Sequence, residues 1–148
     1  MAVRRVLVLV LIVGVLVWAG GVRLSRAAEA QNRLEGRVYR GETGVEPPGS
    51  TPIQGVTVSL YCSGNQWELG SFVRSTTTDE EGWYGLEVYS GDLCDYYNIV
   101  ETNLPNYVSV GATTVGGSVI DENWIQYVSP LEGQTPVSYT HLTLPTKA

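Results

Sequence analysis

Apolar and polar residues alternate through the middle of the chain. The clearest run is Gly55–Cys62, in which Val56, Val58 and Leu60 fall on one face of an extended segment together with Cys62. A period of two residues is that of a β-strand with one face buried. This run therefore predicts a strand that packs on a hydrophobic core by one face only.

A second stretch, Ser75–Val88, predicts two strands joined by a tight acidic turn, and we expect this hairpin to organise the fold. The β-branched run Thr76–Thr78 suits a half-exposed strand. The turn Asp79–Gly82 supplies a side-chain acceptor and a glycine that tolerates positive φ. After the turn, the residues divide into an apolar face, Tyr84, Leu86 and Val88, and a wetter face, Trp83, Gly85 and Glu87.

Further strands and loops follow from the same patterns. Glycine and proline in Gly41–Gly55, and small residues in Gly111–Gly117, predict loops. About seven short strands, with helical periodicity only at the N-terminus, favour one antiparallel Ig-like β-sandwich of about one hundred residues. The other predicted strands are Glu35–Arg40, Ser71–Thr78, Tyr96–Glu101, Tyr107–Val110 and Trp124–Val128.

Residues 1–30 have the features of an export signal. Arg4 and Arg5 precede an apolar run over residues 6–19, and Ala28-Glu29-Ala30 offers a small-residue cleavage site. An uncleaved N-terminal membrane anchor is the alternative, because the apolar run approaches the length of a membrane span. Either a signal helix or an anchor would place the remaining chain outside the cell.

Residues 137–148 are expected to be a non-native tail. The segment Val137–Thr146 reads VSYTHLTLPT and resembles the translation of a transposon-type sequencing adapter. On this interpretation the sandwich domain covers residues 31–136, is truncated at its C-terminus, and does not include the single histidine, His141.

Charge changes the picture once both ends are set aside. Removing four arginines and one glutamate at the front, and the only lysine at the back, takes the net charge from −6 to −10. Such an acidic surface disfavours nucleic acid and anionic lipid as partners.

The frame of these residues resembles the prealbumin-like B domains of SD-repeat and collagen-adhesin surface proteins of bacteria, relatives of carboxypeptidase-regulatory-like domains. The family pattern has a G-x-V strand, a G-V-x-V-x-L strand, a T-T-T-D-x-x-G-x-Y hairpin and an E-x-x-P-x-x-Y element. These motifs match Gly36 and Val38, then Gly55, Val56, Val58 and Leu60, then Thr76–Asp79, Gly82 and Tyr84, and finally Glu101 and Tyr107, with Pro105 one place late.

The resemblance implies a non-catalytic extracellular module, strung in stalks or attached to larger surface proteins and secreted enzymes. Many such domains close a lysine–asparagine isopeptide bond, which this domain lacks the lysine to form. Others bind calcium after the first strand, but Gly41–Glu46 is too poor in oxygen ligands to predict that site.

Cys62 and Cys94 are the only cysteines, and an even count in an exported domain predicts a disulfide. Two buried free thiols are the alternative. No histidine adjoins them, so they predict neither a zinc site nor a thiol nucleophile.

One of two acidic groups in the sequence is a candidate for calcium. Asp79 and Glu81 could hold the ion with a neighbouring carbonyl, although the simpler interpretation is that Asp79 caps its own turn. Asp92 and Asp95 flank Cys94 and are interpreted as surface charge. No cofactor is otherwise expected.

Aromatic residues allow a sugar-binding platform, but packing in the core or across strands is their commoner fate. Trp83 is the best candidate to face a ligand, since its phase is opposite to that of Tyr84. The other members considered are Trp67, Tyr89, Trp124 and Tyr127.

Three functional hypotheses follow, and none involves catalysis by this domain, because no catalytic motif is present. The first is a structural or spacer module of a secreted or surface protein, whose partners are neighbouring domains of the same polypeptide. The second is a module that binds an extracellular carbohydrate or protein through exposed aromatic residues such as Trp83. The third is an accessory domain of a secreted enzyme.

Overall fold

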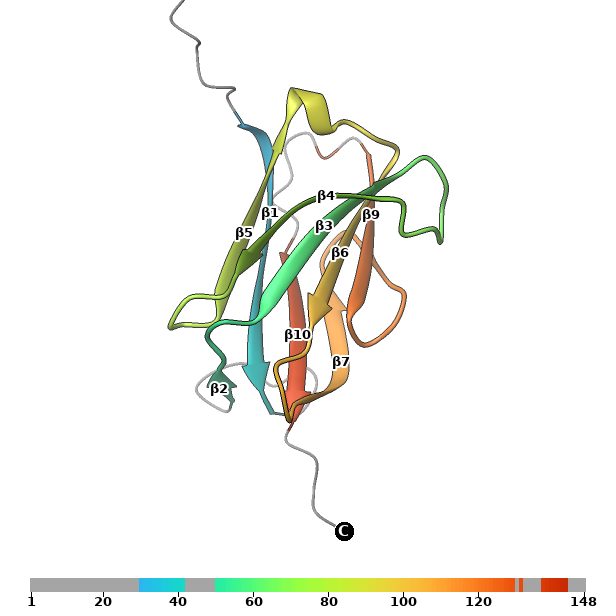
Figure 1. Cartoon of the computed structure of the whole chain (residues 1–148). Helices are drawn as coiled ribbons and strands as arrows, with labels where there is room; N and C mark the ends of the chain where they lie inside the picture. Colours follow the sequence, from blue (N-terminus) through green and yellow to red (C-terminus); the bar gives the residue numbers. More distant parts are fainter. Residues whose placement is uncertain (1–29, 42–49, 130, 132–136, 144–148) are drawn as a thin grey trace, which may run out of the picture.

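A computed structural model of the chain describes residues 30–41, 50–129, 131 and 137–143, so the predicted export signal lies outside the described residues. Within them the chain forms two β-sheets packed face to face, which confirms the predicted sandwich (Figure 1). The elements are β1 (Ala30–Arg40), β2 (Thr51–Pro52), β3 (Thr57–Ser63), β4 (Ser71–Thr77), β5 (Trp83–Tyr89), the short 3-10 helix η1 (Ser90–Asp92), β6 (Tyr96–Thr102), β7 (Val108–Thr114), β8 (Ser118–Val119), β9 (Trp124–Val128) and β10 (Val137–Thr143).

The first sheet is built on β1, which pairs with β5 and β2 along one edge and with β10 along the other, and β7 follows β10. The second sheet has the order β4-β3-β6-β9-β8. Among the described strands all pairings are antiparallel except that of β1 with β10, which is parallel. The predicted antiparallel sandwich is therefore confirmed, with one parallel pair among the described strands.

Strand β1 begins at Ala30, five residues before the predicted start at Glu35. The segment before Glu35 is polar and shows no alternation, but β5 supplies a ladder for it. Arg33 also forms ion pairs with Glu35 at 3.2 Å and with Glu87 at 3.4 Å. The tertiary partner, rather than the local pattern, extends this strand.

The two strands of the predicted hairpin exist, but they do not pair with each other. Strand β4 pairs with β3 in the second sheet, whereas β5 pairs with β1 in the first. Thr78, between them, is buried; its hydroxyl donates to the Ile53 carbonyl at 2.6 Å and accepts the Val56 N–H at 3.0 Å. These bonds turn the chain from one sheet to the other, so the acidic turn is a corner.

Strands β7 and β10 depart furthest from the predictions. Strand β7 continues through Thr114, into the segment Gly111–Gly117 that was predicted as a linker, because β10 pairs along it. Strand β10 lies in the predicted non-native tail, and its Thr140 and Leu142 side chains are buried. The pairing does not test the origin of residues 137–148, which stays a prediction.

The hydrophobic core lies between the sheets and collects the alternating residues of their inner faces. Tyr84, Leu86 and Val88 face it as predicted, while Trp83 is 38% exposed. Full burial of such a side chain contributes about 1.5–3 kcal/mol. The core also contains Leu34, Val38, Ile53, Val56, Val58, Leu60, Tyr97, Ile99, Ile125, Tyr127, Leu131 and Leu142.

Gly82 gives a test of the corner. Its φ is 78°, and a Cβ built there would collide with the Val38 carbonyl oxygen. We expect Gly82→Ala to lower the free energy of unfolding by at least about 2 kcal/mol, from left-handed strain and the backbone clash together. Gly91→Ala is the matched control, since a Cβ there meets nothing within 4 Å. Equal urea midpoints for the two variants would contradict this account.

Candidate functional site

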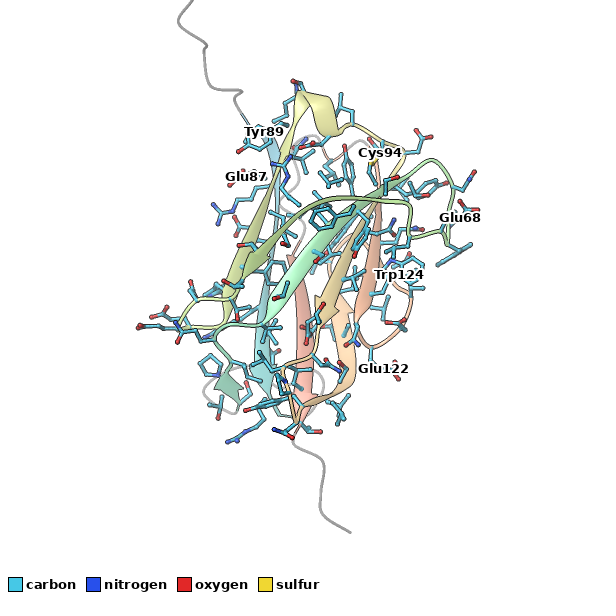
Figure 2. All side chains as sticks on the ribbon, in the orientation of Figure 1. Glu68, Glu87, Tyr89, Cys94, Glu122 and Trp124 are labelled. Carbon is cyan, nitrogen blue, oxygen red and sulfur yellow. A yellow bond between two sulfur atoms is a disulfide. The ribbon has the colours of Figure 1, made fainter. Side chains whose placement is uncertain are left out.

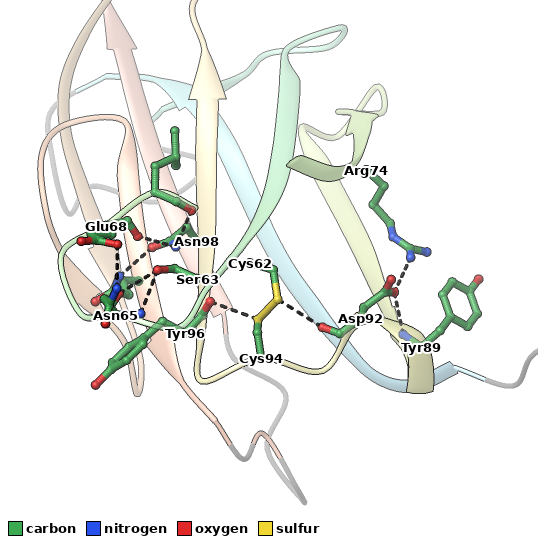
Figure 3. Close-up of a disulfide and its surroundings, with 12 residues drawn as sticks. Cys62, Ser63, Asn65, Glu68, Arg74, Tyr89, Asp92, Cys94, Tyr96 and Asn98 are labelled. Atoms are coloured by element: carbon green, nitrogen blue, oxygen red, sulfur yellow. Dashed lines mark hydrogen bonds and ion pairs between the residues drawn. A yellow bond between two sulfur atoms is a disulfide. The ribbon is translucent and has the colours of Figure 1, made fainter. Parts of the chain in front are cut away.

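The two cysteines form the predicted disulfide, with an S–S distance of 2.11 Å and 5.8 Å between the Cα atoms (Figure 3). Cys62 lies near the end of β3, and Cys94 lies between η1 and β6. The bridge therefore fastens the connection that leads from the first sheet back to the second, at the end of the sandwich where β1 begins (Figure 1).

The aspartate before Cys94 has a structural role that the sequence did not indicate. Asp92 accepts the Tyr89 N–H through Oδ2 at 3.0 Å and forms an ion pair with Arg74 (Figure 3). The Arg74 guanidinium lies 4.5 Å from the centre of the Tyr89 ring. Asp92 is thus half-buried and engaged, whereas Asp95 is exposed surface charge, as interpreted.

The acidic turn is held by its own first residue. Asp79 Oδ1 accepts the Glu81 N–H at 3.0 Å and the Trp83 N–H at 2.8 Å. The predicted capping role of Asp79 is therefore confirmed, and the Glu80 and Glu81 side chains are exposed. Among the described residues, no three acidic, cysteine or histidine side chains gather as metal ligands. A calcium ion at Asp79 and Glu81 stays a prediction.

Trp83 points away from the core, as its phase predicted. However, the Arg37 guanidinium lies 5.3 Å from the centre of its ring, close enough for a cation–π contact. Arg37 Nε also donates to the Glu81 carbonyl at 2.7 Å, which fixes the cation there. One face of the indole is therefore occupied, which weakens its candidacy as a ligand platform.

The other aromatic candidates divide sharply between core and surface. Tyr127 is in the core. Trp124 is half-buried, and its Nε1 donates to Asn98 Oδ1 at 2.9 Å. Trp67 is 57% exposed, well above Trp83. The sequence did not single out Trp67, because it lies in an irregular loop where alternation gives no phase.

Glu101 is a buried acid that the local sequence pattern did not predict as a site. Glu101 on β6 is only 3% exposed, and neither carboxylate oxygen has a hydrogen-bond partner in the described structure. Burial raises the pKa of Glu101 to about 7, and the nearby Thr140 hydroxyl offsets this only partly, since it makes no hydrogen bond of normal geometry. Its position in phase with the core residues Tyr97 and Ile99 was the available signal.

A pocket of about 360 Å³ opens beside the disulfide, near the start of β1. Its described lining includes one carboxylate, Asp95, and neither a histidine nor a basic side chain. It therefore brings together no acid–base pair.

Comparison with known proteins identifies the fold alone. No family model matches the chain, and no curated protein sequence matches it. Solved structures of the shaft pilin SpaA from Lactobacillus rhamnosus GG are similar: the unmodified protein has a TM-score of 0.51 at 14% identity, over 78% of this chain and 52% of the pilin. Two variants of SpaA give TM-scores of 0.50 and 0.52 at 13% and 14% identity. This chain thus spans about half the length of those pilins, and the prealbumin-like family stays unconfirmed at the level of sequence.

No helix among the described residues is long and apolar enough to cross a bilayer.

The disulfide gives a stability prediction. Replacing both Cys62 and Cys94 by alanine should lower the free energy of unfolding by about 3–4 kcal/mol. The bridge joins residues 32 positions apart, and this closed loop lowers the conformational entropy of the unfolded chain. Urea unfolding of the parent and the double variant measures the difference. Mass spectrometry of the unreduced parent is the control: two free thiols there would contradict the bridge.

Glu101 gives a prediction about pH. Its pKa is about 7 in the folded chain and 4.5 in the unfolded chain, so the folded state retains the proton between these values. The contribution of Glu101 to stability is therefore complete below about pH 4.5, declines as the pH rises and is lost above about pH 7. We expect Glu101→Gln, which does not titrate, to exceed the parent in stability by about 3 kcal/mol more at pH 8 than at pH 4.

The measurement is urea unfolding of both proteins at several pH values. The difference in the free energy of unfolding between the two proteins at each pH cancels the titration of all other carboxylates. Glu87→Gln is the control, because Glu87 is partly exposed and paired with Arg33. A difference between parent and Glu101→Gln that did not change with pH would show that Glu101 ionises normally.

Proposed function

We propose that this chain is a non-catalytic structural module that spaces or presents neighbouring domains of a bacterial secreted or cell-surface protein. The observation that carries the proposal is the parallel pairing of β1 with β10, the last described strand. Because residues 137–148 are predicted to be a non-native tail, the proposal requires that the native last strand take the same place beside β1. Strand β1 begins at one end of the sandwich and β10 finishes at the other (Figure 1). A polypeptide that continued in both directions would therefore leave the domain at opposite poles.

This geometry suits a stalk. When domains have their entry and exit points at opposite poles, joining them end to end gives a particle whose length is the sum of the domain lengths. If the entry and exit points lay side by side, successive domains would pack next to each other instead. Strand β1 has 11 residues and runs from one pole to the other, so each domain would contribute about 35–40 Å of length. The disulfide supports the same role, because it resists opening of the domain and persists outside the cytoplasm.

The comparisons add support at the level of fold. The similar structures are shaft pilins, and the match covers about half of their length, as expected for one module among several. We infer neighbouring domains of the same polypeptide as the partners and the cell exterior as the location. An accessory role beside a secreted enzyme would use the same geometry, since it also requires only that the module hold a neighbour at a distance.

Joining copies of the domain end to end tests the proposal. Two and three copies, each linked from the end of β10 to the start of β1 of the next, should lengthen the particle by roughly 35–40 Å per added copy. Small-angle X-ray scattering measures the maximum dimension. The single domain is the control, and a dimension that hardly grew with copy number would show that the copies pack side by side and cannot serve as spacers.

A further inference from the structure

Two amide side chains are buried at the centre of the outward face of the second sheet, where exposed side chains would be expected. Asn98 on β6 and Gln126 on β9 are cross-strand neighbours that point away from the core, yet they are 0% and 3% exposed. What covers them is the loop between β3 and β4, residues 64–70, which folds over the sheet (Figure 3). The two amides are therefore buried beneath a loop on the solvent side of the sheet.

Asn98 and Gln126 fix this loop through their hydrogen bonds. Asn98 Nδ2 donates to the carbonyl oxygens of Glu68 at 3.0 Å and Leu69 at 2.9 Å. Gln126 Oε1 accepts the Trp67 N–H at 3.2 Å, and Gln126 Nε2 donates to Asn98 Oδ1 at 2.8 Å. Because every polar atom of the pair is engaged, the loop has a defined position.

Within the loop a local network adds rigidity. Ser63 Oγ donates to the Asn65 carbonyl at 2.9 Å and accepts the Asn65 N–H at 3.0 Å. Asn65 Nδ2 donates to Glu68 Oε2 at 2.9 Å. The loop ends at Gly70, where φ is 77° and a Cβ would collide with the Cys62 carbonyl. The sequence is therefore adapted to one conformation of this loop.

Trp67 is the residue that this conformation presents. Its φ is 66°, in the left-handed region that bulky residues rarely occupy. Glycine would satisfy the backbone better, and burial of the indole could compensate for the strain, but the side chain is 57% exposed. The fold thus gains little from a tryptophan here, and strain of this kind concentrates at binding sites.

Other aromatic side chains share the same outward face. Phe72 on β4 is 59% exposed and meets Tyr61 on β3 edge to face, with 5.7 Å between ring centres. Trp124 lies on the other side of the covered amides, near Glu68 (Figure 2). From β4 to β9 these residues span three strand spacings, about 14 Å. The face therefore carries aromatic rings on both sides of the loop that presents Trp67.

Charge decides between possible occupants. Three of the four arginines among the described residues lie on β1, in the other sheet, and the fourth, Arg74, is paired with Asp92. The polar groups beside Trp67 are an amide and a carboxylate, from Asn65 and Glu68. Such a surface repels anionic polymers and can bond hydroxyl groups, while flat aromatic rings stack on the C–H faces of sugar rings.

From these observations we propose that the loop 64–70 and the outward face of the second sheet form a binding site for a neutral polysaccharide, with Trp67 as the stacking residue. This site is distinct from the acidic corner at Asp79–Gly82, which joins the two sheets, and from Trp83, which belongs to the first sheet. It also goes beyond a spacer role, since a stalk module needs no ligand.

The test is retention of the purified chain on insoluble neutral polysaccharides: cellulose, xylan, chitin and starch. We expect retention on at least one of them, a loss of at least tenfold in affinity for Trp67→Ala, and an unchanged affinity for Trp83→Ala. Trp83→Ala is the matched control, because it removes the same ring from the first sheet. Failure of the parent to bind any of the four, or equal losses in both variants, would overturn the proposal.

Two further measurements separate a ligand site from a structural role and from other partners. Trp67→Gly should lose binding with a Tm equal to or above that of the parent, because glycine relieves the left-handed strain; a lower Tm would show that Trp67 serves the fold. Retention on polygalacturonate instead of the neutral polymers would assign the face to an anionic glycan and overturn the proposal. Retention only by a cell-surface protein would do the same.

Discussion

The corner between β4 and β5 is the constraint on which the sandwich depends. There the Val38 N–H donates to the Gly82 carbonyl, and the Val38 carbonyl accepts the Ile53 N–H. One turn away, the Thr78 N–H donates to the Val56 carbonyl. The corner thus binds the central strand of the first sheet and the approach to β3 of the second at a single point, so the two sheets cannot shift independently.

The position of β1 that this corner fixes also determines the position of β10. Val38 is the cross-strand neighbour of Thr140 in β10, so the corner, β1 and β10 are in register. Because β1 and β10 run parallel, the start of β1 and the end of β10 lie at opposite poles of the sandwich, and the proposed spacer function depends on this arrangement. A local turn therefore contributes to the long-range shape of the module.

Two buried polar side chains on β6, Asn98 and Glu101, differ in whether their polar atoms have hydrogen-bond partners. Asn98 is covered from the solvent side and has partners for all its polar atoms, so it orders a loop. Glu101 faces the core without a partner, so it is retained most easily as a neutral acid. Asn98 therefore fixes the surface loop above it, whereas Glu101 lowers the stability of the fold at neutral pH. Both residues are buried because β6 is central in its sheet and is covered on both faces.

Local patterns in the sequence determined the strands of clean alternation, the inward set Tyr84, Leu86 and Val88, the turn at Asp79 and the pairing of Cys62 with Cys94. These depend on residue period, turn chemistry and cysteine count, which are local or compositional. Only the tertiary structure decided that β4 and β5 join different sheets, that β1 begins at Ala30 and that β10 fills the place beside it, because hydrogen-bond partners distant in sequence select strand pairing. The same reason explains why the best ligand candidate is Trp67 rather than Trp83. Arg37 contacts the Trp83 ring, whereas the loop that Asn98 and Gln126 hold in place leaves Trp67 exposed.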